Sequence, residues 1–227
     1  MRSSSRSLVP VVATLVLLVA RAAGAGPATD QLRVQVDRVI KVLEDPALKK
    51  DGRAPDRRAA IRQVASEIFD FNELSRRCLG RHWQARTPAE QADFTQAFTD
   101  LLEHAYVSKI EAYSGEKVQF TGEQLEGEYA MVKTKIVTPQ GTEIPVDYRL
   151  YKQGDRWRAY DVNVEGVSLV ANYRSQFNAI LQRQSYAELM KTLRAKQAQL
   201  SQGTGKPVPP EGGAGARPGG ASGGQQP

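Results

Sequence analysis

Two carboxylates in the second half of the chain are the side chains best suited by type to acid–base chemistry. Asp147 and Asp161 each alternate with apolar neighbours in segments that are typical of strands. Because successive strand side chains point to opposite faces, both carboxylates should face away from the apolar side and into solvent. A general acid or base with a raised pKa needs burial, so we expect surface roles for both. Glu165, which precedes Gly166, is expected to cap the following helix.

The remaining reactive side chains are few, and their spacing does not indicate catalysis or metal binding. The one cysteine, Cys78, excludes an internal disulfide and should be a small buried hydrophobe. The two histidines, His82 and His104, lack ligand spacing such as H-E-x-x-H. We expect His82 to pack or hydrogen-bond between helices and His104 to be partly exposed. No nucleophile or phosphate-loop motif occurs, so the sequence predicts no enzymatic activity, metal or cofactor.

The positive charge of the chain does not indicate a nucleic-acid partner. The formal net charge is +6 over 227 residues, but residues 1–25 and 201–227 carry four of those charges. About +2 is left on residues 26–200, which contain no run of five basic residues. Since a phosphate-binding surface needs clustered Lys and Arg, we expect no nucleic-acid binding.

The two ends of the chain differ in composition from its body. Residues 1–25 have the basic, apolar and small-residue order of a cleaved secretory signal peptide. Their apolar run, 8–20, would reach about 20 Å as a helix, which is too short for about 30 Å of bilayer hydrocarbon. Residues 201–227 contain nine Gly and five Pro, so we predict a disordered tail. One exported domain is left at 26–200.

Hydrophobic spacing in this domain predicts helices on both sides of a strand region. The predicted helices cover about 28–44, 61–80, 88–113, 167–182 and 186–193. A capping box formed by Thr87 and Glu90 marks the start of the longest one. After Glu116 the period changes from 3.6 to 2, and short turns separate four segments, which indicates an antiparallel meander.

These elements predict an α+β fold with a curved four-stranded antiparallel sheet wrapped by helices. A single curved sheet must cover its apolar face, and helices 88–113 and 167–182 are the expected covers. The apolar side chains between them could fill an ordinary core or surround a hydrophobic cavity, and composition does not separate the two.

Several separated motifs follow one another in a characteristic order over about residues 30–196. The most specific are Trp157–Val162, Glu165–Val170 and Asn172–Phe177. The others are Phe69–Phe71, Leu79–Trp83, Thr87–Gln91, Tyr113–Gly115 and Ile144–Tyr148. Together they resemble the MlaC (toluene-tolerance) family of periplasmic phospholipid carriers of Gram-negative bacteria. The long tail after residue 200 and the cysteine at position 78 depart from the pattern expected of that family.

The resemblance implies a nuclear-transport-factor-2-like cone, in which the acyl chains of a phospholipid enter the gap between sheet and helices. It implies two partners: an outer-membrane lipoprotein complex and an inner-membrane ABC transporter with an MCE-domain subunit. We therefore predict a monomeric periplasmic carrier that shuttles phospholipid between the outer and inner membranes and maintains outer-membrane lipid asymmetry.

The predicted lipid-binding residues come from the inward side of the strands and from the two covering helices. The strand residues are Val132, Ile136, Val146, Tyr148, Leu150, Tyr160, Val162 and Val164. The helix residues are Phe98, Leu102, Tyr106, Tyr173 and Phe177. Some of them are expected to be plain core. Arg81 and Arg174 are basic residues that could meet a lipid phosphate at the rim.

Two other functions stay open at the level of sequence. An enzyme on the same cone, acting on a small apolar substrate, would place an acid or base inside the pocket. A periplasmic adaptor that binds no lipid would have a filled core.

Overall fold

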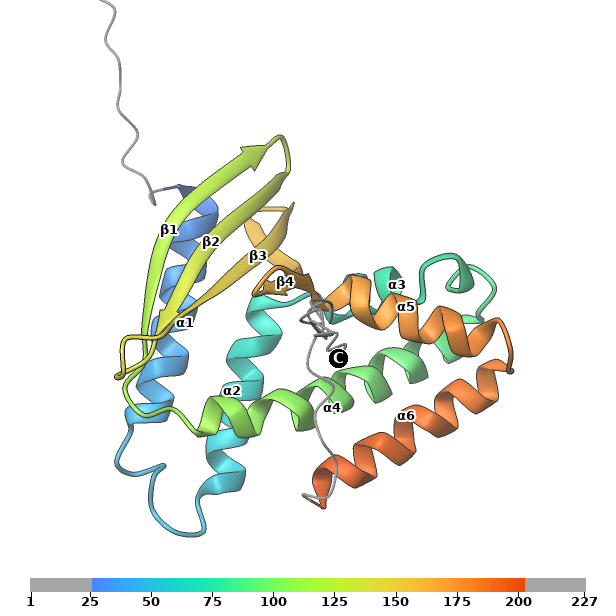
Figure 1. The fold of residues 1–227 in the computed structure, drawn as a ribbon, viewed down its shortest axis with the longest axis horizontal. Coiled ribbons are helices and arrows are strands. Elements are labelled where there is room, and N and C mark those ends of the chain that lie inside the picture. The colour runs from blue at the N-terminus through green and yellow to red at the C-terminus, as the bar shows by residue number, and fades with distance from the viewer. Residues whose placement is uncertain (1–25, 203–227) are drawn as a thin grey trace, which may run out of the picture.

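A computed structural model describes residues 26–202, in which helices surround one antiparallel sheet (Figure 1). The helices before the sheet are α1 (Pro27–Glu44), α2 (Ala54–Ile68), α3 (Phe71–Leu79), the short 3₁₀ helix η1 (Gly80–His82) and α4 (Pro88–Glu111). The strands are β1 (Lys117–Glu126), β2 (Tyr129–Val137), β3 (Glu143–Gln153), β4 (Arg156–Val164) and β5 (Val167–Ser168). The helices after the sheet are α5 (Leu169–Leu181) and α6 (Tyr186–Ser201). The predicted signal peptide, 1–25, and the predicted tail from residue 203 onward lie outside the described residues.

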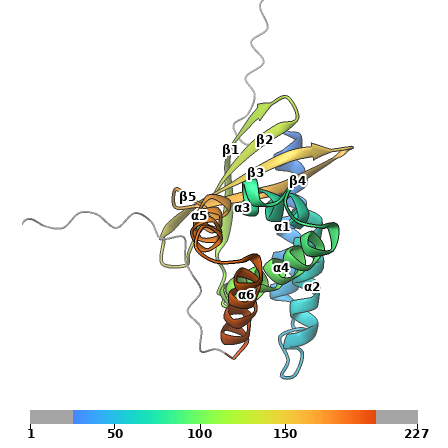
Figure 2. The same cartoon turned by 90° about the vertical axis from the view of Figure 1, so that its right-hand side faces the viewer.

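The sheet is the predicted meander, with the strands in the order β1-β2-β3-β4-β5. A two-residue fifth strand, Val167–Ser168, pairs with the end of β4, so the predicted count of four strands was one short. A strand of two residues leaves no alternating pattern in the sequence. Figure 2 shows the strands in the upper part of the side view and helices α2 and α6 in the lower part.

The helix predicted over 61–80 is two helices, α2 and α3. Asp70 lies between them and caps α3, because its carboxylate accepts a hydrogen bond from the backbone N–H of Glu73 at 2.9 Å. The backbone N–H of Asp70 donates to the carbonyl of Ala159 in β4 at 2.9 Å, which ties the break to the sheet. The apolar spacing continues across the break, so periodicity alone predicted one continuous helix.

The predicted start of the longest helix is confirmed by the contacts at its first turn. The backbone N–H of Glu90 donates to the Thr87 hydroxyl at 3.2 Å, and the backbone N–H of Thr87 donates to the Glu90 carboxylate at 2.9 Å. This reciprocal pair is the predicted capping box.

The first hydrophobic core lies between α1, α2 and one face of the sheet. Its buried members are Ala28, Leu32, Val64, Ile68, Ala130, Val132, Leu150, Trp157 and Ala159. Helices α1 and α2 therefore cover the sheet, whereas that role was predicted for 88–113 and 167–182. Every predicted helix has an apolar side, so spacing could not indicate which of them packs against the strands.

The second hydrophobic core lies among α3, α4, α5 and α6, and Figure 1 shows α4 and α6 side by side. At its centre Phe98 is 0% exposed, and its ring centroid lies 4.9 Å from that of Tyr173 and 5.2 Å from that of Phe177. Both contacts are edge-to-face, the arrangement that aromatic quadrupoles favour. These helices thus use their apolar sides mainly on one another.

Replacing Phe98 by Ala should lower the free energy of unfolding by about 3–5 kcal/mol, because the change leaves a cavity at the centre of the second core. Urea unfolding of the mature domain, followed by circular dichroism, measures this loss. Phe98→Leu keeps most of the side-chain volume and should lose markedly less. A loss below about 1 kcal/mol for the alanine variant would contradict a packed core at this position.

Candidate functional site

Seven of the eight predicted strand residues lie on one face of the sheet, which we call the inward face. Residues directly opposite each other in an antiparallel pair point to the same side. Tyr148 lies opposite both Val132 and Val162, and Val146 lies opposite Val164. The other predicted members of this face are Ile136 and Leu150. The prediction of a shared apolar face is therefore confirmed for these seven residues.

The inward face has a closed end and an open end. At the closed end Val132 and Leu150 are 0% and 1% exposed beneath α1 and α2, so they are core residues. The open end consists of residues that are only half-buried although most of them are aliphatic: Ile136, Tyr148, Val162 and Val164. The candidate site on the sheet is therefore the open end, while the closed end stabilises the fold.

Tyr160 lies on the opposite face, which corrects its prediction as an inward residue. The strand pairing shifts between Arg149 and Leu150 of β3, so β4 carries one extra residue at this point. Such a bulge interrupts the alternation of side chains along a strand. On the outward face the Tyr160 ring contacts Tyr129, Tyr151 and the guanidinium carbon of Arg77, the last at 3.9 Å from the ring centroid.

Asp161 is 3% exposed, which corrects the prediction that it faces solvent. Its carboxylate accepts hydrogen bonds from the Ser168 hydroxyl at 2.6 Å and from the backbone N–H of Val170 at 3.0 Å. These two contacts attach the start of α5 to β4. Glu165, which was predicted to cap this helix, lies instead in the preceding turn with a φ of 51°, next to Gly166 at 87°. Both oxygens of the buried carboxylate thus have a structural role.

The predicted helix residues lie in the second core rather than against the strands. Phe98, Leu102, Tyr173 and Phe177 are buried there, and Tyr106 is half-buried at its edge. The two cores are linked through Phe69, which packs against both. The structure therefore divides the predicted site into a sheet part and a helix part.

Three predicted site residues are tyrosines whose hydroxyl groups have no hydrogen-bond partner within residues 26–202. Burial raises the pKa of Tyr148 to about 12, and burial also raises the pKa of Tyr106 and of Tyr173. A buried tyrosine hydroxyl normally finds a partner, as that of Tyr186 does at the Glu90 carbonyl, 2.8 Å away. These three phenols therefore mark positions where a ligand or water must supply the hydrogen-bond acceptor.

The other reactive side chains have the structural surroundings predicted for them. Cys78 is 0% exposed, and burial raises the pKa of its thiol far above the usual range, whereas a nucleophilic thiol needs a lowered pKa. A ring nitrogen of His82 lies 3.1 Å from the amide oxygen of Asn178, which also accepts a hydrogen bond from Arg81 at 2.9 Å. His104 is half-buried on α4, with Nδ1 2.7 Å from the Asp100 carbonyl oxygen.

Within the described part of the chain, no group of three His, Cys, Asp or Glu side chains could hold a metal ion. Among the helices described there, none has both the length and the apolar character needed to cross a membrane.

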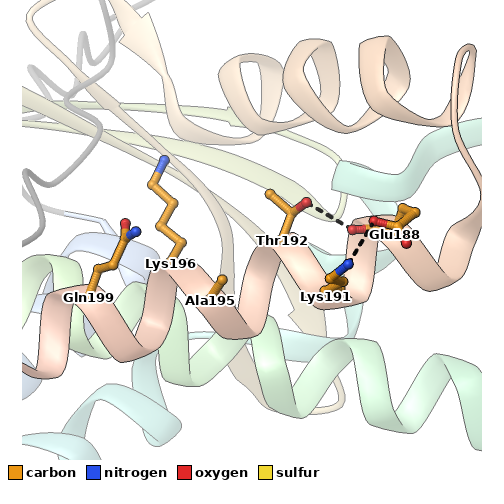
Figure 3. A pocket seen from close by; sticks show the side chains of 6 residues that line it. All are labelled: Glu188, Lys191, Thr192, Ala195, Lys196 and Gln199. Carbon is orange, nitrogen blue, oxygen red and sulfur yellow. Dashed lines mark hydrogen bonds and ion pairs between the residues drawn. The ribbon is translucent and has the colours of Figure 1, made fainter.

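A hollow of about 440 Å³ runs along α6 (Figure 3). Its lining residues are Glu188, Lys191, Thr192, Ala195, Lys196 and Gln199. A smaller cavity of about 40 Å³ adjoins it between α4, α5 and α6, where Tyr173 and Phe177 line the wall. Lys196 lines both spaces, and burial lowers the pKa of its amine. Lys196 was not predicted as a site residue, because a lysine on an amphipathic helix carries no distinguishing spacing.

The amino-acid sequence is similar to that of known proteins over most of the described domain. Residues 33–195 match the family model described as MlaC protein. The chain is similar to the intermembrane phospholipid transport system binding protein MlaC of Haemophilus influenzae, with 22% identity over 147 residues, or 63% of this chain and 69% of that relative. It is also similar to the toluene tolerance protein ttg2D of Pseudomonas putida, with 24% identity over 126 residues, or 55% of this chain and 59% of that relative.

Among solved structures, the fold is similar to that of a phospholipid-binding protein from Ralstonia solanacearum, determined in complex with a phospholipid. The TM-score is 0.70 at 25% sequence identity, and the match covers 77% of this chain and 98% of that one. The family match begins within α1 and ends within α6, so it includes all buried members of the second core and all of the first except Ala28 and Leu32.

Replacing Asp161 by Ala should lower the free energy of unfolding by about 1–3 kcal/mol, because two donors at the start of α5 lose their buried acceptor. Thermal or urea unfolding of the purified domain measures the change. Asp147→Ala, on the neighbouring strand, is the matched control and should stay within about 0.5 kcal/mol of the unmodified protein. Equal losses in the two variants would show that Asp161 is not the anchor of α5.

Proposed function

The chain belongs to the MlaC family, and on that premise we propose that it is a periplasmic phospholipid carrier. It takes up a phospholipid by its acyl chains and moves it between the outer and inner membranes, which maintains the lipid asymmetry of the outer membrane. The observation that carries the proposal is the open end of the inward face. There Ile136, Val162 and Val164 present apolar surface outside the core that α1 and α2 form with the sheet.

The ligand class is supported by the phospholipid in the similar structure from Ralstonia solanacearum. The name of the Haemophilus influenzae relative, a binding protein of an intermembrane phospholipid transport system, supports the same class and a role in transport rather than catalysis. The buried carboxylate of Asp161, the most suitable acid–base candidate by position, is engaged by Ser168 and Val170. A carrier therefore accounts for the site better than an enzyme on the same fold.

The energetics of such a carrier follow from the size of its ligand. A diacyl phospholipid has about 30 methylenes, and removing them from water yields a gross transfer free energy of order 20 kcal/mol. A bilayer offers a similar gain, so exchange between carrier and membrane is near balance, whereas release into water is very slow. Transfer therefore requires a docked partner, and its direction comes from that partner or from ATP hydrolysis elsewhere.

The partners in this proposal are an outer-membrane lipoprotein complex and an inner-membrane ABC transporter with an MCE-domain subunit. Export is assigned to residues 1–25 as a cleaved signal peptide, which leaves a monomeric carrier domain in the periplasm. Contact with the membranes then takes place through the partners.

The proposal predicts that the mature protein, purified from the periplasm without detergent, carries a stoichiometric diacyl phospholipid. Native mass spectrometry compared with the mass of the organic extract detects it. A lipid-free protein that also takes up no labelled phospholipid from vesicles would overturn the carrier assignment and leave the adaptor or the enzyme.

Replacing Val164 by Glu should abolish lipid retention while export and folding persist, because an ionised carboxylate at the open end would have to lose its water beneath the acyl chains. Bound phospholipid per protein is measured after purification, with circular dichroism as the folding check. Val146→Glu should have the same effect on lipid but a larger effect on stability, since Val146 is 5% exposed.

Met131→Glu is the matched control for this experiment. Met131 is half-buried on the outward face, opposite Arg149, so a carboxylate there has a cation across the strand. It should keep its phospholipid. Full retention of lipid by a folded Val164→Glu protein would contradict the site.

A further inference from the structure

Tyr148 introduces one polar group into an otherwise aliphatic part of the inward face. Its cross-strand neighbours are Val132 and Val162, and the next inward residues along β3 are Val146 and Leu150. Its ring also packs against the core beneath α1 and α2. Tyr148 is therefore the one residue among these neighbours whose side chain can donate a hydrogen bond.

The hydroxyl of Tyr148 differs from the other hydroxyl on the same face. Thr134 is 1% exposed, and its hydroxyl donates to the carbonyl of Val146 at 2.6 Å, so the fold itself satisfies it. Tyr148 is half-buried, and its hydroxyl has no partner among the described residues. A donor that the protein leaves unpaired in apolar surroundings costs free energy whenever its ligand offers no acceptor.

We propose that the Tyr148 hydroxyl donates a hydrogen bond to an ester carbonyl oxygen of the bound lipid, so that the carrier prefers lipids whose chains are joined through ester bonds. The inference rests on the proposed function and deepens it, since it names the chemical linkage that the site recognises. It also gives the lipid a fixed depth, because the ester groups lie where the chains join the glycerol.

The acceptor is the ester rather than the phosphate because of the charge around Tyr148. Its nearest neighbours on this face, Val132, Val146, Leu150 and Val162, are aliphatic and carry no charge. A phosphate drawn to this position would lose its water without gaining a cation, which is costly. An ester carbonyl is neutral and accepts a hydrogen bond without that cost. A site built around such a bond discriminates against an analogue that lacks the acceptor.

The experiment compares a diester phosphatidylethanolamine with its diether analogue of the same chain length. Both lipids are presented in equal amounts in mixed vesicles, and the ratio taken up by the delipidated full-length mature protein is measured by mass spectrometry. The unmodified protein should prefer the diester by about three- to tenfold, the range expected for one neutral hydrogen bond. Tyr148→Phe keeps the ring and should bring the ratio close to one.

Tyr129→Phe is the matched control, because Tyr129 is 51% exposed and lies on the outward face opposite Tyr151. It should keep the full preference for the diester. An unmodified protein without preference, or a preference that survives Tyr148→Phe, would overturn the ester contact while the carrier function stands. Equal weakening of both lipids by Tyr148→Phe would assign the hydroxyl to the phosphate and overturn it as well. Failure of the unmodified protein to take up either lipid would contradict both the proposed function and this inference.

Discussion

A single twisted sheet has one apolar face to bury, and in this protein two helices cover only part of it. Helices α1 and α2 close the end around Val132 and Leu150. Helices α3 to α6 bury their apolar sides against one another in a separate core. Apolar surface left in water costs roughly 25 cal/mol per Å². The open end is therefore a place where an apolar ligand lowers the free energy of the folded chain, and the division into two cores creates it.

The strand region was predictable because each strand alternates and each turn is short, so the pattern indicated an antiparallel meander and the residues that share a face of β2 and β3. One bulge in β4 accounts for the wrong prediction for Tyr160, because it turns this side chain outward, yet no glycine or proline in this segment marks it in the sequence. Asp161 lies opposite Arg149, on the face that alternation predicts, but its contacts with Ser168 and Val170 bury it there. Val162 and Val164 keep their predicted face, since the pairing beyond the bulge is regular. Alternation therefore predicts a face only up to the next irregularity.

The helix packing was predictable only in part, for a different physical reason. An amphipathic helix shows which side it buries but not which partner buries it, so α4 and α5 were assigned to the sheet that α1 and α2 cover. Tyr106, Tyr148 and Tyr173 were candidates by type and spacing. That their hydroxyls lack a partner among residues 26–202 depends on tertiary contacts, which no spacing rule contains.

At the β4–α5 junction, the buried carboxylate of Asp161 fixes the start of α5 to the sheet, so a partner that displaced this helix would first have to break that contact.

Cys78 lies close to the same junction, with its sulfur 3.9 Å from the Val170 carbonyl oxygen. It is the one thiol of the chain, and burial keeps it protonated because its pKa is raised. Thiol reagents and oxidants act on the accessible thiolate, so the folded protein presents almost none to them. A cysteine introduced at the surface would therefore take up a spin or fluorescent label alone, with the native cysteine left in place. Distances between the helices and the sheet can therefore be measured with labels on introduced cysteines, without replacing Cys78.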